Sequence, residues 1–384
     1  MEKKYITEIL HHLGEDDLPC GAVNPPIFQT SIFSFKGFDE FSTALSDETN
    51  HFLYTRGNNP TVNILEEKLA ALEHAERAKL FGSGVAAIVS SISAFLKSGD
   101  HIVTVKDCYS WTSTYVTQYL ARFGVEHTYV EGNDVNEIEA ALKPNTKIIY
   151  LESPTTFTFK LQDLTEVSSL ARMRGVKTII DNTWATPIYQ NPIDFGIDLV
   201  VHSASKYLGG NSDVVGGVVA GSDKDVRRIF EKEFLNTGAV PDPFAAWLIL
   251  RGIRTLHIRM PVHFQNAMEL SRRLQKSEAV ESVLYPMLES SEQYALAKKQ
   301  MRGGSGLFSF KLKTRDIDRI KKFVNSLRFF RRAVSWGGYE SLISPYAVSH
   351  RDPGDNVSLI RIHAGLEEIE VLSEDLDRAM KELG

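Results

Sequence analysis

One acidic and one basic side chain each follow a short apolar segment. Asp181 comes directly after the segment 176–180, and Lys206 lies a few residues after the segment 199–201. Both segments contain β-branched residues and end in polar ones, as buried strands of parallel sheets do. Ligands bind at the carboxyl ends of such strands. A lysine and an acid at that edge indicate a pyridoxal phosphate (PLP) site, because the lysine forms a Schiff base and the acid partners the pyridinium nitrogen.

The surroundings of this pair favour binding of the cofactor phosphate. Ser203 and Ser205 flank Lys206, and the segment 81–85 contains two glycines and opens a helix predicted to run to residue 97. Free amides at a helix N-terminus bind phosphate, and glycine lets the ligand approach closely. Two hydroxyl groups and one helix N-terminus are therefore the expected phosphate ligands.

A second interpretation of the glycine segment stays open at this point. Gly82, Gly84 and Ala87, followed by a predicted strand and Asp107, resemble the fingerprint of a dinucleotide-binding domain. A nicotinamide-dependent dehydrogenase would explain this spacing. It would not explain the acid and the lysine at the two other strand ends.

Two further side chains fit a flat cofactor and an amino-acid substrate. Tyr109 follows the predicted strand 101–105, where its ring can stack on the cofactor, although partly buried tyrosines without a function are common. Arg361 lies in the alternating segment 359–362. A buried arginine there needs an anionic partner such as a substrate carboxylate, whereas an arginine facing solvent would need none.

The elements that position these residues alternate along the chain. Strands are predicted at 101–105, 147–151 and 176–181, and a helix at 163–174. This alternation is typical of a mainly parallel sheet covered by helices, so the fold class is α/β.

The two ends of the chain have a different character. After residue 240 the segments 306–312 and 359–362 alternate as antiparallel strands do, and helical patterns occupy 257–276 and 368–382. Residues 1–60 look irregular and predict an arm that packs on something else. We therefore expect an N-terminal arm (1–60), a large α/β domain (61–240) and a smaller C-terminal α+β domain (241–384).

Composition excludes several classes of function. The 384 residues carry a formal net charge of −6 and lack the concentrated basic face of a nucleic-acid-binding protein. Two cysteines are too few for a disulfide framework, and no segment is apolar over the length that spans a bilayer. His11 and His12 lack metal-ligand spacing, so no metal is expected. The simplest expectation is a cytoplasmic protein.

Eight motifs together resemble one family, the PLP-dependent enzymes of Cys/Met metabolism (the transsulfuration group, fold type I). They are YTRGNNPT (54–61), FGSGVAAI (81–88), DNTWATP (181–187), HSASKYLGGNSDVVGG (202–217), LRGIRTL (250–256), SGLFSF (305–310), SWGGYESLI (335–343) and IRIHAGLE (360–367). The resemblance implies a seven-stranded, mainly parallel sheet between helices and a homotetramer built as a dimer of dimers with shared sites.

The resemblance also implies a role for each matching residue. Lys206 would hold PLP and move protons, together with Tyr109, which would stack on the ring. The other cofactor ligands would be Asp181 and Thr183, the amides of Gly84 and Val85, Ser203 and Ser205, and, from a neighbouring subunit, Tyr54 and Arg56. The substrate would be held by Arg361, Ser335 and Trp336.

Within the family, SWGGYESLI is similar to bacterial cystathionine β-lyases, and a β-lyase is therefore the expected activity. It would cleave L-cystathionine to homocysteine, pyruvate and ammonia. The motifs at 54–61 and 202–217 are closer to the γ-acting branch. Cystathionine γ-synthase, O-acetylhomoserine sulfhydrylase and methionine γ-lyase are the alternatives that this implies.

Overall fold

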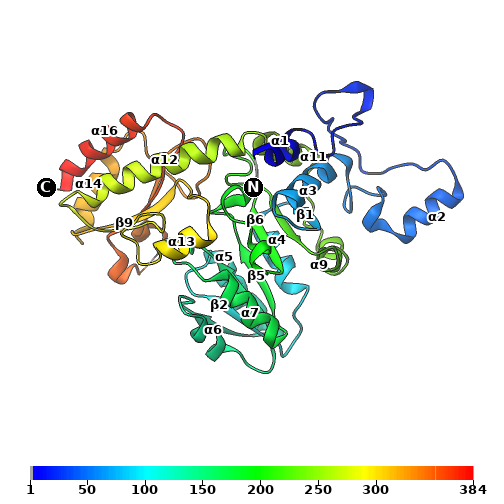
Figure 1. The fold of residues 1–384 in the computed structure, drawn as a ribbon, viewed down its shortest axis with the longest axis horizontal. Helices are drawn as coiled ribbons and strands as arrows, with labels where there is room; N and C mark the ends of the chain where they lie inside the picture. The colour runs from blue at the N-terminus through cyan, green and yellow to red at the C-terminus, as the bar shows by residue number, and fades with distance from the viewer. Residues whose placement is uncertain (1–2, 351, 384) are drawn as a thin grey trace.

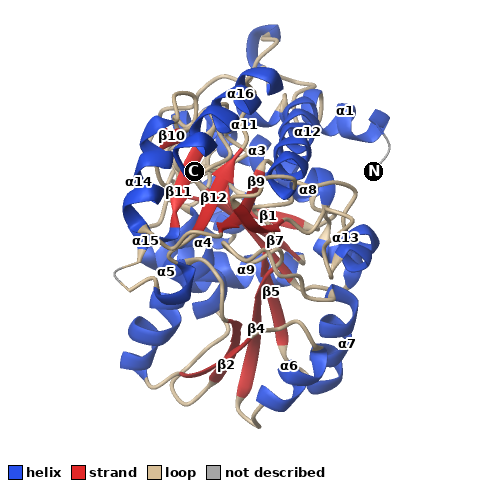
Figure 2. Ribbon diagram, turned by 90° about the vertical axis from the view of Figure 1, so that its left-hand side faces the viewer, coloured by secondary structure: helices blue, strands red, loops and turns tan. Residues whose placement is uncertain are grey.

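The computed structural model describes residues 3–350 and 352–383 and contains two β-sheets with helices packed against them (Figures 1 and 2). The larger sheet has the strand order β1-β7-β6-β5-β4-β2-β3. Strands β2 to β6 pair in parallel, whereas β7 is antiparallel to both β6 and β1. The bounds are β1 Arg77–Phe81, β2 His101–Val105, β3 Glu126–Val130, β4 Thr146–Glu152, β5 Lys177–Asp181, β6 Leu199–Ser203 and β7 Gly217–Gly221. The predicted seven-stranded, mainly parallel sheet is confirmed.

The helices begin where the sequence provides caps. Asn59, Ser83 and Asp163 each accept a hydrogen bond from the first turn of the helix that follows them. The bounds are α3 Pro60–Leu72, α4 Gly84–Ser93, α5 Ser110–Thr114, α6 Val135–Ala141, α7 Leu164–Arg174, α8 Thr186–Tyr189, α9 Asp223–Ile229, α10 Leu235–Thr237 and α11 Pro243–Ile253. Helix α4 ends at Ser93, four residues before the predicted end.

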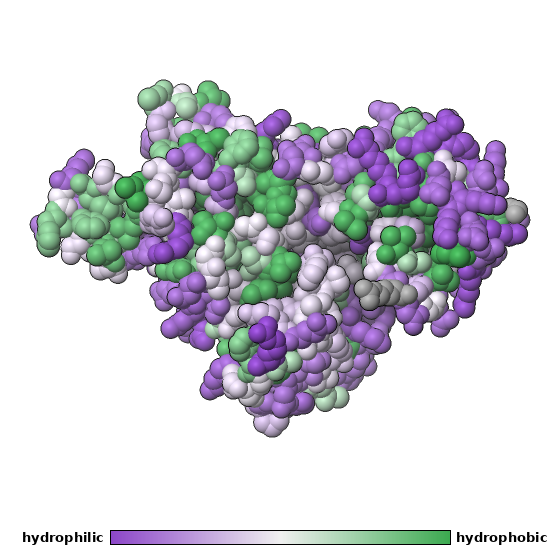
Figure 3. All heavy atoms as spheres, turned by 180° about the vertical axis from the view of Figure 1, so that it is seen from behind, coloured by the Kyte–Doolittle hydropathy of each residue, from purple (hydrophilic) through white to green (hydrophobic). Residues whose placement is uncertain are grey.

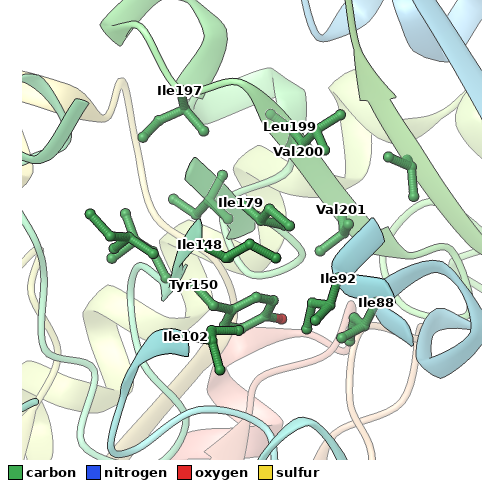
Figure 4. Close-up of a cluster of buried hydrophobic side chains, with 14 of the residues drawn as sticks. Ile88, Ile92, Ile102, Ile148, Tyr150, Ile179, Ile197, Leu199, Val200 and Val201 are labelled. Atoms are coloured by element: carbon green, nitrogen blue, oxygen red, sulfur yellow. The ribbon is translucent and has the colours of Figure 1, made fainter. Parts of the chain in front are cut away.

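Both faces of the larger sheet are buried, which explains its apolar strands. On one face, Ile88 and Ile92 of α4 lie in the same cluster as Ile179 and Val201 (Figure 4). The other face is covered by α3 and α11, whose leucines and isoleucines join alternate residues of β1 and β7. A rigid, two-sided core therefore fixes the carboxyl ends of β4, β5 and β6.

The smaller sheet lies in the C-terminal half, and its strand order is β10-β11-β12-β9-β8. All its pairs are antiparallel except β10 with β11. Its strands are β8 Val280–Leu284, β9 Leu307–Leu312, β10 Arg331–Arg332, β11 Leu342–Pro345 and β12 Leu359–His363. The helices around it are α12 Leu256–Gln275, α13 Tyr294–Gln300, α14 Ile317–Ser326, α15 Tyr346–Ser349 and α16 Ile369–Met380. Trp184, just after β5, donates from its indole nitrogen to the Leu307 carbonyl at 2.9 Å and so links the two sheets.

The expectation of irregular structure over residues 1–60 was wrong in two places. Helix α1 (Lys3–His11) buries Ile9 and Leu10 against the cluster that contains α3. Helix α2 (Phe38–Ser46) lies on a segment that projects from the body (Figure 1). Tertiary packing stabilises α1, and the local sequence pattern did not reveal this.

The projecting segment exposes many apolar side chains. Hydrophobic residues gather on it in the space-filling view (Figure 3), and Val23, Ile32, Phe38 and Leu45 are each more than half exposed. Large exposed apolar patches are typical of interaction surfaces. No helix in the part of the chain that the structure describes is both long and apolar enough to cross a membrane.

Candidate active site

The carboxyl ends of three neighbouring strands meet at one edge of the larger sheet. Asp181 ends β5 and is directly opposite Glu152, which ends β4. Ser203 ends β6 on the other side of β5. The strand order therefore brings the predicted acid, Asp181, to the same edge as the segment that carries Lys206, and places a second acid, Glu152, beside it.

Asp181 is a buried carboxyl group to which no cation is bonded among the residues that the structure describes. The backbone amide of Thr183 donates to its Oδ1 at 2.9 Å, and the Thr183 hydroxyl also bonds this oxygen. Burial raises the pKa of Asp181, while the bonds from Thr183 and the charges of His202 and Lys206 lower it. A buried acid of this kind gains most from a positively charged partner such as a pyridinium N–H.

Lys206 reaches the same edge from the loop after β6. Its Nζ bonds the hydroxyl of Ser335 and lies 5.5 Å from the centre of the Trp336 ring. Burial and, to a smaller extent, the charge of Arg361 lower the pKa of Lys206 to about 8, against the opposing effect of Asp181. A larger fraction of the amine is therefore neutral near pH 7 than for a lysine in water, and the neutral amine is the nucleophile.

The loop that carries Ser335 and Trp336 is held tightly against the lysine. A Cβ on Gly337 would lie 2.8 Å from the backbone nitrogen of Tyr207, and the φ of Gly337 is +89°. His363 of β12 bonds the Gly338 carbonyl through its Nε2 at 3.1 Å. Glycine is required here because the backbone of the loop lies directly on the backbone of the lysine segment.

A narrow cradle lies between the start of α4 and the end of β6. A Cβ on Gly84 would lie 2.8 Å from the Ser203 Cβ and 2.9 Å from its Oγ. Ser83 caps α4 by accepting from the Ala86 amide at 3.1 Å, and the first amides of a helix have no partner within it. The amides of Gly84 and Val85 thus lie beside the Ser203 hydroxyl, a fit for phosphate. Ser205 lies nearby, but its hydroxyl already bonds the Gly216 backbone.

Tyr109 is placed at this edge by the second acid. Its backbone amide donates to Glu152 at 2.7 Å, and its side chain is 39% exposed. Burial raises the pKa of Tyr109, and the negative charges of Asp181 and Glu152 raise it further. The partly exposed ring is therefore available to a flat ligand over the edge of the sheet.

Arg361 is a largely buried cation that lacks an ionic partner. Within residues 3–350 and 352–383, no carboxylate or carbonyl bonds its guanidinium, whose Cζ lies 4.6 Å from the centre of the Phe157 ring. Burial lowers the pKa of Arg361 to about 10, and the charge of Glu152 raises it. The prediction left open whether this side chain faces solvent, and the structure shows a partly buried residue whose guanidinium lies beside the Phe157 ring.

Tyr54 and Arg56 are not brought to the site within one chain. Both side chains are exposed, and the Arg56 guanidinium lies 5.6 Å from the centre of the Tyr54 ring. Among the described residues, no hydrogen bond, ion pair or ring contact joins either of them to Lys206 or Asp181.

Sequence reasoning missed three residues at this edge. Glu152 carried the same signal as Asp181, an acid at the end of an apolar strand, and was not used. Burial and the neighbouring Asp181 raise the pKa of Glu152 well above its usual range. His202, buried and bonded to Glu73 at 2.5 Å, and Phe157 gave no local signal, because their roles depend on contacts with distant segments.

The residues present fit PLP. Gly84 brings the start of α4 directly against Ser203, where a side chain would collide with the end of β6. Among the described residues no cation bonds the buried Asp181, and Lys206 is a buried amine with a lowered pKa. Lys206 would form the Schiff base, and Asp181 would bond the pyridinium nitrogen. When bound, PLP would withdraw electrons from the bonds at the substrate Cα.

Comparisons with known proteins agree with this fit. L-methionine gamma-lyase of Treponema denticola is 40% identical over 97% of this chain and 96% of that protein. Cystathionine beta-lyase MetC of Bacillus subtilis is 37% identical over 98% of this chain and 96% of that protein. The crystal structure of metB from Corynebacterium glutamicum has a TM-score of 0.92 and 35% identity, and the match covers 99% of this chain and 98% of that one.

The dehydrogenase alternative finds no support in these relatives. The similarity to the metB structure confirms the predicted fold type I architecture. The model of the family described as "Cys/Met metabolism PLP-dependent enzyme" matches residues 6–381, nearly the whole chain. The chain therefore belongs to this family of PLP-dependent enzymes, in which its carbon–sulfur lyase relatives also fall, and pyridoxal phosphate is its cofactor.

Proposed function

We propose that the protein is a carbon–sulfur β-lyase that converts L-cystathionine and water to homocysteine, pyruvate and ammonia. The observation that supports this most directly is the position of Trp336, whose ring lies 5.5 Å from the Lys206 amine. The hydroxyl of Ser335 bonds the same amine. These two neighbours restrict where the base can move.

A restricted base suits β-elimination better than γ-elimination. In β-elimination one proton leaves the substrate Cα and the Cβ–S bond breaks. A γ-elimination needs a second proton abstraction, at Cβ, so the base has to serve two carbon atoms. A bulky indole beside the amine favours the reaction that uses a single position.

The role that we assign to each residue of the site follows from its charge and its burial. Arg361 binds the α-carboxylate, because no anion among the described residues bonds its largely buried guanidinium. Lys206, with its pKa of about 8, takes the Cα proton on Nζ and returns a proton to the departing sulfur. Asp181 keeps the pyridinium nitrogen protonated, and Tyr109 stacks on the ring.

Methionine γ-lyase is the second candidate, because relatives with this activity are as similar to the chain as cystathionine β-lyases are. Two such enzymes, from Treponema denticola and Porphyromonas gingivalis, are 40% and 39% identical to this chain. The cystathionine beta-lyase of Bacillus subtilis is 37% identical. Sequence identities this close do not distinguish the two activities, so the reaction products have to distinguish them.

The deciding experiment is an end-product assay on the holoenzyme. L-cystathionine cleaved on the β side yields pyruvate, whereas cleavage on the γ side yields 2-oxobutanoate; the two are resolved by mass spectrometry. We expect pyruvate, and no methanethiol from L-methionine. A product that is mainly 2-oxobutanoate would refute the β-lyase assignment. The variant W336L tests the reasoning, because it should raise the fraction of 2-oxobutanoate.

We also propose that the projecting segment completes the site of a second subunit, within a homotetramer built from dimers. Tyr54 and Arg56 are exposed and lie on a segment with several exposed apolar side chains. Mixing inactive R56A and K206A subunits tests this, since one site of each mixed dimer would have both a native Arg56 and a native Lys206. Activity should return on mixing; a monomer in light scattering, or no recovery, would contradict the proposal.

A further inference from the structure

The turn between β4 and α7 contains a strained phenylalanine. Phe157 has a φ of +59°, which is rare for a bulky side chain. The turn is held by bonds between its own ends: the Thr155 amide donates to the Lys160 carbonyl at 2.9 Å, and the Lys160 amide donates to the Thr155 hydroxyl at 2.9 Å. Such strain persists where the surroundings over-determine it, often at functional sites.

The strained backbone turns the Phe157 ring toward Arg361. The guanidinium carbon lies 4.6 Å from the ring centre, which is within the range of a cation–π interaction. This contact uses none of the guanidinium N–H groups, and none of them bonds a carboxylate or carbonyl within residues 3–350 and 352–383. Those N–H groups are the ones that bind a carboxylate in the bidentate manner.

Two other rings fix the position of Phe157. Tyr346 lies edge-on to it at 5.1 Å with an interplanar angle of 79°, and His350 at 5.9 Å with 75°. Tyr346 and His350 are themselves stacked at 3.6 Å with an angle of 4°. The ring that contacts Arg361 is therefore supported from behind by a stacked pair at helix α15.

We propose that Phe157 is a positioning residue for the substrate α-carboxylate: its ring holds the Arg361 guanidinium ready before the substrate binds. The proposal rests on the role given to Arg361 in the proposed function. Core packing alone would not need a left-handed backbone at a phenylalanine. It would also not leave a buried cation with an aromatic face as its main neighbour.

The test compares a carboxylate with its neutral analogue. The probes are 3-(methylthio)propanoate and 3-(methylthio)propanamide, which lack the amino group that reacts with PLP, and their binding to the holoenzyme is measured by calorimetry. F157L keeps an apolar side chain but removes the aromatic face. We expect it to weaken carboxylate binding about five- to tenfold and amide binding less than twofold. F157Y, which keeps the ring, should stay within about twofold of the wild type for both probes.

Phe159 provides the matched control. It lies in the same turn with a φ of +53°, but its ring faces Trp184, with the ring centres 6.3 Å apart. F159L should lower stability without changing the ratio of carboxylate to amide binding. In steady-state kinetics, F157L should raise KM for the amino-acid substrate more than it lowers kcat. If F157L does not fold, F157M makes the same comparison.

Two outcomes separate this inference from the proposed function. If R361L loses the preference for carboxylate and F157L does not, the positioning role of Phe157 is refuted and the role of Arg361 stands. If R361L keeps the preference for carboxylate, the role of Arg361 fails, and the inference fails with it. Equal loss of both probes in F157L would indicate a merely structural role.

Discussion

Substitution of Gly84 by alanine is the sharpest test of the phosphate cradle. The added Cβ would lie 2.8 Å from the Ser203 Cβ, 2.9 Å from its Oγ and 3.0 Å from its Cα. These contacts are too short for carbon atoms, so the start of α4 and the end of β6 must move apart. The expected phosphate ligands lie on both of these segments.

The size of the effect follows from the collision. Forcing one extra methyl group into a packed site costs about 1–3 kcal/mol. If this free energy destabilises the PLP-bound state, the dissociation constant of PLP rises about 5- to 150-fold. Helix propensity alone predicts the opposite sign, since alanine inside a helix is about 1 kcal/mol more favourable than glycine. The two explanations are therefore distinguishable by sign.

The assay is titration of the apoprotein with PLP, followed by visible absorbance, with urea unfolding of the apoprotein in parallel. The control is the double variant G84A/S203G compared with S203G. Because S203G removes two of the atoms that the new methyl group would meet, G84A should cost less in that background. PLP binding by G84A that is as tight as in the wild type would refute the cradle.

Two further predictions concern buried charges. Burial lowers the pKa of Lys206 from 10.5 to about 8. Between these two pH values the unfolded chain therefore binds more protons than the folded apoprotein does. The free energy of unfolding of the apoprotein should therefore rise with pH across this window. K206M should abolish that rise in urea unfolding and also the visible absorbance band of the Schiff base with PLP. A parallel pH profile in both proteins would contradict the prediction. Lys79 and Glu66 form a buried pair at 3.2 Å, with side-chain exposures of 5% and 9%, so K79M should destabilise the protein by about 3–5 kcal/mol. K79M/E66Q should recover much of this in urea unfolding, and equal loss in both variants would show that the stranded charge is not the cause.

Local patterns in the sequence determined the strands and the chemistry at their ends. The apolar segments before Asp181 and near Lys206 predicted buried strands, because only residues buried on both faces of a sheet are so uniformly apolar. Polar residues at strand ends in turn predicted ligands at one edge. The same signal at Glu152 was available and would have identified the second acid.

Tertiary structure alone decided which of these residues meet. Glu152 faces Asp181 because β4 and β5 are neighbours in the sheet, and Ser335 bonds Lys206 across 129 positions of the chain. The sequence predicted neither helix α1 nor the contact of the Phe157 ring with Arg361. A helix this short and a single phenylalanine do not give a distinct local pattern. Periodicity reports how each segment buries its own side chains, whereas a site depends on contacts between distant segments, which only the packed fold defines.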